Sequence, residues 1–146
     1  MTNTTASAPF PPFRRVSDLL RDNVRQRPQA KALADDDSAL DWAALDALVD
    51  RVAASLQQAG LRSGDVVAVC AASSVRYAAV YLGSLRAGVV VAPLAPSVTP
   101  EAMASMLGDA QARLLFADAQ GRAAVPPAVM EGAGALPLVA LDDAGA

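Results

Sequence analysis

The chain has 146 residues, which suits one domain, and carries a formal net charge of −3 from 12 basic and 15 acidic side chains. This acidic balance excludes the basic stripe with which nucleic-acid-binding proteins hold phosphates, so no nucleic-acid partner is expected. The chain has no histidine, which removes the commonest general base and the commonest metal ligand.

An arm and a helix are predicted first. Residues 1–13 contain several prolines and are expected to form a flexible N-terminal arm, followed by an α/β subdomain over 14–146. Apolar residues recur at helical spacing from Val16 and predict a helix that ends before the next proline. Ser17 or Asp18 is its expected N-terminal cap.

Two short strands around an acidic turn are predicted next, from KALADDD and SALD. Asp35, Asp36 and Asp37 lie in the turn. Three consecutive carboxylates suggest a metal site, but they point in different directions on a turn, so a solvated turn is favoured. An amphipathic pattern then predicts a helix from an N-cap at Asp41 to a left-handed Gly60.

Two strands and the helix between them follow. VVAVCAA is a short apolar run between turn residues, which is typical of a strand covered on both faces. Ser73 or Ser74 is the expected cap of the next helix, which ends at Gly88. Its predicted buried face consists of Val75, Ala78, Ala79, Leu82 and Leu85. VVVAP predicts a strand with Pro93 at its end, because a central strand needs each backbone N–H.

One further helix and two further strands complete the pattern. Thr99 caps the helix and Pro100 occupies its first turn, where a missing N–H costs nothing. Met103, Met106 and Leu107 form its expected apolar face. RLLFAD and LPLVALDD predict strands, and the stretch between them is expected to be irregular. Strands that alternate with helices predict an α/β fold with a mostly parallel sheet and helices on both faces.

Few side chains are candidates for catalysis. Cys70 lies inside an apolar strand and is interpreted as a small buried residue; as the only cysteine it can form no internal disulfide, and a reducing, cytoplasmic location is expected. Ser73 and Ser74 stand where a nucleophile elbow would, but the glycines that tighten such a turn are missing, so helix capping is favoured. Tyr77 and Tyr81 share a helix face and either line a ligand crevice or pack at a subdomain contact.

The sequence offers weak ligand-binding signals at the ends of strands. Asp118 and Asp142 each follow a predicted strand, where ligands bind to parallel sheets, although aspartate is also a common turn residue and a structural role is favoured. The only lysine, Lys31, follows no glycine-rich turn, and the Gly-Ala-Gly at 132–134 precedes a strand, so both phosphate-binding loops are excluded. We therefore assign no catalytic, cofactor-binding or metal-binding residue to this chain. No apolar run approaches the roughly 18 residues of a membrane span, and none is expected.

Three segments occur in the order and spacing of a known family. The first is Asp41-Trp42, a helix that ends at Gly60, and the Gly-Asp turn at 64–65 before an apolar strand. The second is LRAG at 85–88, the strand VVVA, PLAP at 93–96 and TPE at 99–101. The third is LGDAQARLLFAD. Over about residues 16–143 this order resembles the N-terminal portion of adenylate-forming (AMP-binding) enzymes, the superfamily of acyl-CoA synthetases, adenylation domains and luciferases.

The resemblance implies a ligase that joins a carboxylic acid to ATP as an acyl-adenylate and then passes the acyl group to a thiol. An acyl-CoA synthetase type is preferred, with ATP, Mg and coenzyme A implied for the full-length parent and a role in fatty acid metabolism expected. The family's phosphate loop and catalytic lysine have no match in this sequence. The chain is therefore interpreted as an N-terminal fragment that is inactive alone and needs the remainder of the parent polypeptide as its partner.

Other interpretations remain open. The chain could instead be the N-terminal part of a peptide-synthetase adenylation domain, or a stand-alone, non-catalytic α/β binding or scaffold module. If a larger protein normally covers its apolar surfaces, the fragment is expected to self-associate.

Overall fold

The computed structural model describes residues 12–142, so nearly all of the arm predicted over 1–13 lies outside the described residues. The described helices are α1 (Val16–Gln26), α2 (Trp42–Gln58), α3 (Val75–Arg86), α4 (Pro100–Asp109), α5 (Ala119–Ala124) and α6 (Pro127–Met130). The described strands are β1 (Lys31–Ala34), β2 (Ala39–Asp41), β3 (Val66–Cys70), β4 (Val90–Pro93), β5 (Ala112–Ala117) and β6 (Leu138–Ala140). No helix within residues 12–142 is both long enough and apolar enough to cross a membrane.

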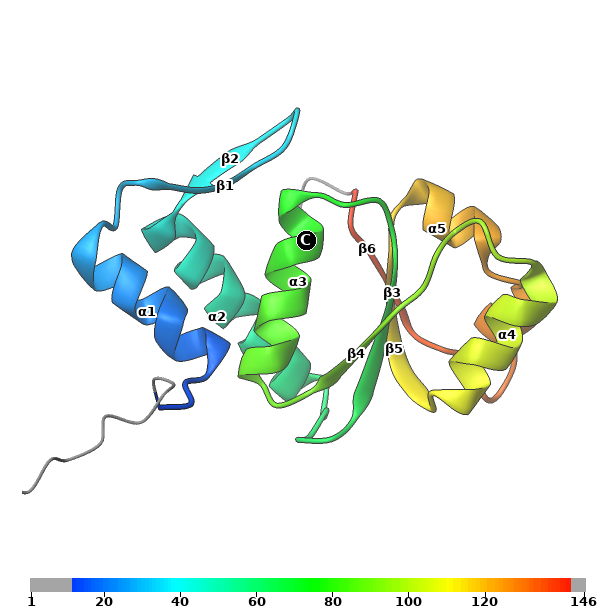
Figure 1. The fold of residues 1–146 in the computed structure, drawn as a ribbon. Helices are drawn as coiled ribbons and strands as arrows, with labels where there is room; N and C mark the ends of the chain where they lie inside the picture. Colours follow the sequence, from blue (N-terminus) through cyan, green and yellow to red (C-terminus); the bar gives the residue numbers. More distant parts are fainter. Residues whose placement is uncertain (1–11, 143–146) are drawn as a thin grey trace, which may run out of the picture.

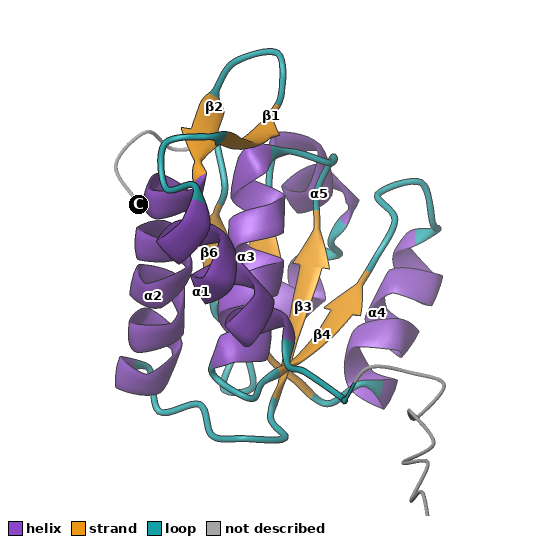
Figure 2. Ribbon diagram, turned by 60° about the vertical axis from the view of Figure 1, so that its left-hand side comes forward, coloured by secondary structure: helices purple, strands orange, loops and turns teal. Residues whose placement is uncertain are grey.

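The main sheet has four strands in the order β4-β3-β5-β6, and every neighbouring pair is parallel. Strand β3 lies inside the sheet, and its residues from Val67 to Cys70 are completely buried. This burial explains the unbroken apolar run in the sequence, because a strand covered on both faces has no solvent side to alternate with. Helices α2 and α3 cover one face and α4 to α6 the other (Figures 1 and 2). The prediction of a parallel α/β sheet with helices on both faces is confirmed.

A smaller layer lies outside α2 and α3. Strands β1 and β2 form the predicted antiparallel pair, and α1 packs beside α2 and α3 (Figure 1). The layer shares a small core in which Leu20 of α1 meets Leu45 and Val49 of α2. The Arg27 guanidinium lies 5.7 Å from the centre of the Trp42 ring, a cation–π contact between the end of α1 and the start of α2.

The helix caps follow the sequence closely. Side-chain oxygens of Asp41, Ser74 and Thr99 each accept a hydrogen bond from the backbone N–H three residues later, at 2.7, 3.0 and 3.2 Å. Gly60 and Gly88 have φ angles of 82° and 75°, the left-handed region in which glycine avoids the steric cost of a side chain. These residues confirm the predicted ends of α2 and α3 and the predicted starts of α2, α3 and α4.

Three local predictions are wrong. Arg15, not Ser17 or Asp18, is the N-cap of α1, and the Arg15 N–H donates to the Asp18 carboxylate at 3.3 Å. Met106 is 44% exposed, so only Met103 and Leu107 of the predicted face of α4 are buried. The stretch expected to be irregular before β6 contains α5 and α6.

The predicted buried face of α3 is confirmed only in part: Val75 and Ala79 are buried, but the rest of the face is rotated. Leu85 is exposed and Leu82 only half-buried, whereas Val80, Gly83 and Ser84 are buried. Helix α2 packs directly on this small-residue face, since a Cβ added to Gly83 would lie 2.5 Å from the Cβ of Val52. The Ser84 hydroxyl donates to the Val80 carbonyl at 2.8 Å, which satisfies it in the core.

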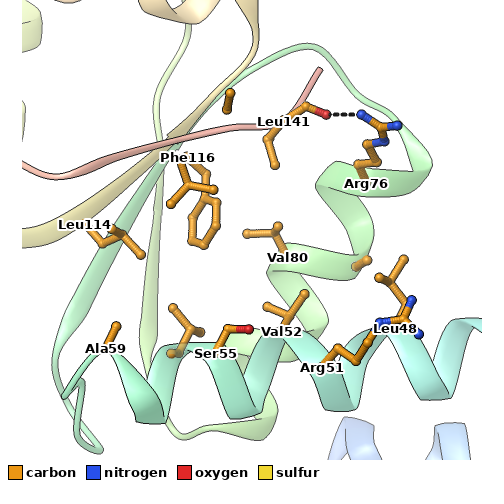
Figure 3. Close-up of a pocket in the computed structure, with 14 residues that line it drawn as sticks. Leu48, Arg51, Val52, Ser55, Ala59, Arg76, Val80, Leu114, Phe116 and Leu141 are labelled. Carbon is orange, nitrogen blue, oxygen red and sulfur yellow. Dashed lines mark hydrogen bonds between the residues drawn. The ribbon is translucent and has the colours of Figure 1, made fainter. Parts of the chain in front are cut away.

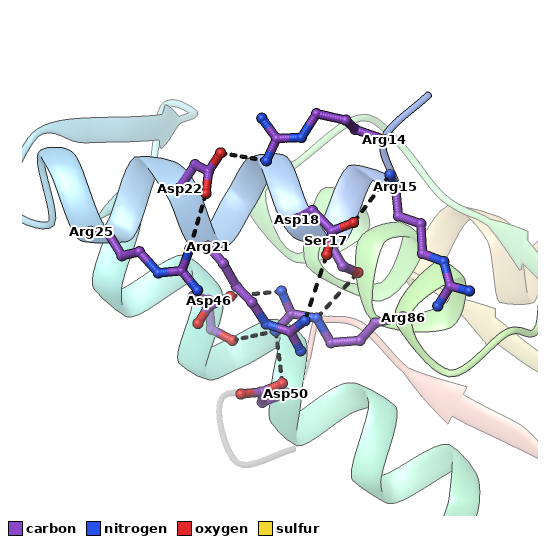
Figure 4. A network of polar contacts seen from close by, with 10 residues as sticks. All are labelled: Arg14, Arg15, Ser17, Asp18, Arg21, Asp22, Arg25, Asp46, Asp50 and Arg86. Atoms are coloured by element: carbon purple, nitrogen blue, oxygen red, sulfur yellow. Dashed lines mark hydrogen bonds and ion pairs between the residues drawn. The ribbon is translucent and has the colours of Figure 1, made fainter. Parts of the chain in front are cut away.

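A buried arginine of α3, Arg86, links this helix to α1 and α2 (Figure 4). The Arg86 side chain is 7% exposed, and its guanidinium contacts Asp46 at 2.6 Å and Asp50 at 2.7 Å, both on α2. It also donates to the Ser17 hydroxyl of α1 at 3.4 Å. Charge-assisted bonds of this kind compensate for the removal of a guanidinium from water.

Candidate functional site

The carboxyl edge of the parallel sheet is the first place to search for a site. From β3 the chain crosses to β4 on one side, and it then returns to β5 on the other side of β3. Strand order therefore reverses between β3 and β5, and ligands of open α/β sheets bind in the crevice outside such a switch point. Asp118 directly follows β5 at this edge.

Both oxygens of the Asp118 carboxylate accept hydrogen bonds from the backbone. Its Oδ2 accepts the Ala72 N–H at 2.8 Å, and its Oδ1 accepts the Gly121 N–H at 2.7 Å. The first bond holds the residues after β3, and the second caps the N-terminus of α5. Asp118 thus fastens the ends of two strands to the following helix.

Glycine at position 121 allows α5 to lie directly on the end of β3. A Cβ built on Gly121 would lie 1.7 Å from the Cys70 carbonyl oxygen. Helix α5 therefore packs directly on the backbone at the end of β3, with no room for a side chain at position 121. Sequence reasoning missed Gly121; a glycine three residues after a strand-ending aspartate was the only signal for it.

Asp142, the second strand-ending aspartate, forms an ion pair. Its carboxylate accepts two hydrogen bonds from the Arg122 guanidinium of α5, at 2.6 and 3.1 Å. These bonds to the Arg122 side chain lower the pKa of the Asp142 carboxyl. Asp118 therefore caps the N-terminus of α5, and Asp142 pairs with Arg122 of the same helix. The two carboxylates support α5 rather than line one open site.

The acidic turn contributes a single structural carboxylate. Asp35 Oδ1 accepts the backbone N–H of Asp37 at 3.0 Å and of Ser38 at 2.8 Å, while Oδ2 accepts the Val75 N–H at 2.7 Å. The bond from Val75 is the main cause of the lowered pKa of the Asp35 carboxyl. Within residues 12–142 no three Cys, Asp or Glu side chains come together as a possible metal site.

The candidate nucleophiles and tyrosines each lie in a different environment. Cys70 is completely buried, and burial raises the pKa of its thiol. Ser74 is the cap of α3, and Ser73 borders a shallow hollow of about 210 Å³ beside the acidic turn. Tyr77 packs against the core between α3 and the sheet, and Tyr81 is 37% exposed.

An apolar groove of about 460 Å³ lies beside α2 and α3 (Figure 3). Its walls come from α2, α3, β5 and β6, and it is lined by Leu48, Arg51, Val52, Ser55, Leu56, Ala59, Arg76, Ala79, Val80, Leu114, Phe116, Val139, Ala140 and Leu141. Two guanidiniums lie at its rim, and the rest of the lining is almost entirely aliphatic. No sequence signal indicated this groove, because segments far apart in the chain build it.

The structure is a parallel α/β scaffold in which the carboxylates described above form hydrogen bonds within the chain itself. Residues 20–143 match the AMP-binding enzyme family, and the chain belongs to that family. Its fold is that of the N-terminal subdomain of adenylate-forming enzymes.

Individual relatives show both the likeness and its extent. The chain is 36% identical over 110 residues to malpibaldin synthetase of Mortierella alpina, a match that covers 75% of this chain and 2% of the relative. The crystal structure of VinN is 27% identical with a TM-score of 0.78, covering 88% of this chain and 33% of VinN. The N-terminal domain of FACL13 from Mycobacterium tuberculosis shares the fold with a TM-score of 0.78 at 20% identity, over 88% of this chain and 33% of that domain. The chain therefore spans a third or less of the length of each of these proteins.

Proposed function

We propose that the chain is the N-terminal α/β subdomain of a longer enzyme that activates a carboxylic acid with ATP. In this reaction a carboxylate oxygen attacks the α-phosphate, pyrophosphate leaves, and an acyl-adenylate forms. The match of residues 20–143 to the AMP-binding enzyme family carries the proposal. Both oxygens of Asp118 accept backbone hydrogen bonds, and residues 12–142 contain no cluster of three metal-ligating side chains, which supports assigning ATP and metal binding to the remainder of the polypeptide.

Two substrate classes are candidates for the longer enzyme. Activation of an amino acid for a peptide synthetase is favoured by the 34% identity over 103 residues to nonribosomal peptide synthetase 5 of Gibberella zeae and by VinN, which has been solved with L-aspartate and with 3-methylaspartate. Ligation of an acyl group to coenzyme A is the type preferred from the sequence motifs, and the fatty acyl CoA synthetase of Mycobacterium tuberculosis shares the fold at 20% identity. The amino-acid class is the better supported of the two.

Pyrophosphate exchange tests the proposal and separates the two classes. The polypeptide encoded by the complete reading frame is incubated with ATP, labelled pyrophosphate and a panel of amino acids and fatty acids. We expect label to enter ATP with members of one panel only, and no exchange above the blank from the 146-residue chain. Thioester formation is then compared between coenzyme A and a carrier protein that bears a phosphopantetheine thiol.

Three results would contradict the proposal. Exchange by the 146-residue chain alone would place the catalytic groups within it. Absence of exchange by the longer polypeptide with every acid would remove the adenylation activity. A reading frame that stops after Ala146 would favour the stand-alone scaffold module instead.

A further inference from the structure

Positive charge is concentrated near the start of the chain. Residues 14–31 contain six basic and two acidic side chains, a net charge of +4, whereas the other residues contain six basic and 13 acidic side chains, a net charge of −7. The basic side chains of this segment belong to α1, to its flanking residues and to the first residue of β1. A charge asymmetry of this size points to an anionic partner that meets the chain at α1.

Large apolar side chains are exposed along the same helix. Phe13, which lies just before α1, is 93% exposed. Val16 and Leu19 are exposed as well, and their spacing of three residues places them on one edge of α1. Leu20 packs in the core between α1 and α2, so the exposed edge is separate from the face that holds α1 on the fold.

Helix α3 adds two apolar side chains beside α1. Tyr81 and Leu85 are exposed and lie four residues apart, so they share one face of α3. Leu85 directly precedes Arg86, whose guanidinium donates to the Ser17 hydroxyl in the first turn of α1 (Figure 4). The Leu85 end of this face therefore lies next to the start of α1. We define the α1–α3 surface as Phe13, Val16, Leu19, Tyr81 and Leu85.

Guanidiniums of α1 and its flank border this surface. The Arg25 side chain is 75% exposed, and its contact to Asp22 is shared, because the same carboxylate also contacts Arg14. The Arg21 guanidinium lies 4.0 Å from the Asp18 carboxylate, and both side chains are exposed. Helix α1 therefore keeps an excess of positive charge beside its exposed apolar edge, a combination typical of helices that lie in the interface of a lipid bilayer.

We propose that the α1–α3 surface binds to the anionic surface of a lipid bilayer without crossing it. Phe13, Val16 and Leu19 enter the boundary of the acyl chains, and the guanidiniums of α1 contact lipid phosphates. The acidic remainder of the chain is repelled by the same phosphates, which turns α1 toward the bilayer. A bilayer fits better than an acidic protein, because a side chain as exposed as that of Phe13 needs a partner that deforms around it. The inference is independent of the proposed function, since it requires neither ATP nor an acid substrate.

Co-sedimentation with vesicles tests this assignment without relying on activity. The polypeptide encoded by the complete reading frame is mixed with vesicles of phosphatidylcholine alone, or of an equal mixture of phosphatidylcholine and phosphatidylglycerol, and the bound fraction is measured against lipid concentration. Phe13→Ser and Leu19→Gln remove exposed apolar side chains of the surface. Met106→Gln is the matched control, since Met106 is 44% exposed, close to the 45% of Leu19, but lies on α4 at the other face of the sheet (Figure 1). Circular dichroism checks that each variant is folded.

We expect binding to the mixed vesicles only. Phe13→Ser or Leu19→Gln should raise the lipid concentration at half-binding about tenfold, and Met106→Gln should leave it unchanged. Arg25→Gln should raise it about fivefold, the contribution of one basic side chain near an anionic membrane. Arg113→Gln, which removes an exposed ion pair at β5, should have no effect. Salt at about 0.5 M should weaken the binding, because it screens the contacts to phosphate.

Several results would overturn the assignment. Equal binding to both kinds of vesicle, or to neither, would do so, as would equal effects of Leu19→Gln and Met106→Gln. Binding that is weakened by Arg25→Gln but by neither apolar substitution would identify a purely ionic contact. Binding to polyglutamate in place of the mixed vesicles would identify an acidic protein as the partner. Self-association in light scattering that Phe13→Ser abolishes, without vesicle binding, would identify a second copy.

Discussion

Replacement of Gly121 by alanine tests the close packing of α5 on the end of β3. The added Cβ would lie 1.7 Å from the Cys70 carbonyl oxygen and 2.7 Å from its carbon, whereas real Cβ contacts essentially never fall below 3.0 Å. Because both atoms belong to the backbone of the central strand, α5 has to move away by more than about 1 Å. That movement breaks the 2.7 Å bond from the Gly121 N–H to Asp118.

The expected cost combines two effects. Overpacking costs about 1–3 kcal/mol, and loss of a hydrogen bond to a charged group costs about 1.5–3 kcal/mol. We therefore expect Gly121→Ala to lower the free energy of unfolding by about 4 kcal/mol, which for a domain of this size lowers Tm by roughly 10 °C.

Urea unfolding followed by circular dichroism, with a thermal scan, measures the loss of stability. Gly108→Ala is the matched control: Gly108 lies within α4, and a Cβ there meets no atom within 4 Å. Since alanine has the higher helix propensity, the control should raise stability by about 0.5–1 kcal/mol. Similar effects of the two substitutions would refute the close packing of α5 on β3.

Two further predictions concern charged contacts. Arg86→Met leaves Asp46 half-buried and unpaired, so we expect the free energy of unfolding in urea to fall by about 2 kcal/mol, which is below the range for fully buried pairs because Asp50 is 62% exposed. Arg25→Met removes an exposed ion pair and is the control. An equal effect of the two substitutions would contradict a buried network. The pKa of Asp35 is held below its ordinary value of 3.8, mainly by the Val75 N–H. Its contribution to stability is therefore present above that value and is lost as the pH falls through the lowered pKa of the folded state. Asp35→Asn should reduce this acid-dependent loss, which is measured as Tm against pH. The Asp36 carboxylate forms no hydrogen bond with another described residue, so the control Asp36→Asn should leave the dependence of Tm on pH unchanged.

Local signals in the sequence determined much of the fold. Asp41, Ser74 and Thr99 are predictable caps because a cap acts within three residues of its own position. The parallel sheet was predictable because buried strands and amphipathic helices alternate along the chain.

The face that a helix buries was harder to predict. Hydropathy favours Leu82 and Leu85 on α3, but the helix buries Gly83 and Ser84, since α2 approaches closest where side chains are small. Short helices such as α5, with six residues, have too few turns for a clear periodic pattern.

The candidate site depended on contacts between distant residues. The position of Asp118 at the end of a strand was predictable, but its bond to Ala72 joins residues 46 positions apart. The contact of Gly121 with Cys70 and the apolar groove arise in the same way, from packing between separate segments. A single sequence carries no local pattern for such contacts.

The attachment of α1 has a consequence for how the molecule opens. Only Leu20 of this helix is buried in the outer core, and Arg86 reaches it through one hydroxyl. The contacts of α1 with the rest of the chain are thus few compared with the buried residues that hold the sheet. We expect α1 to detach while the sheet stays intact, so its amide protons should exchange with deuterated solvent ahead of those in β3. Added salt should hasten that exchange, because ionic screening weakens the polar part of its attachment and leaves the apolar cores of the sheet in place.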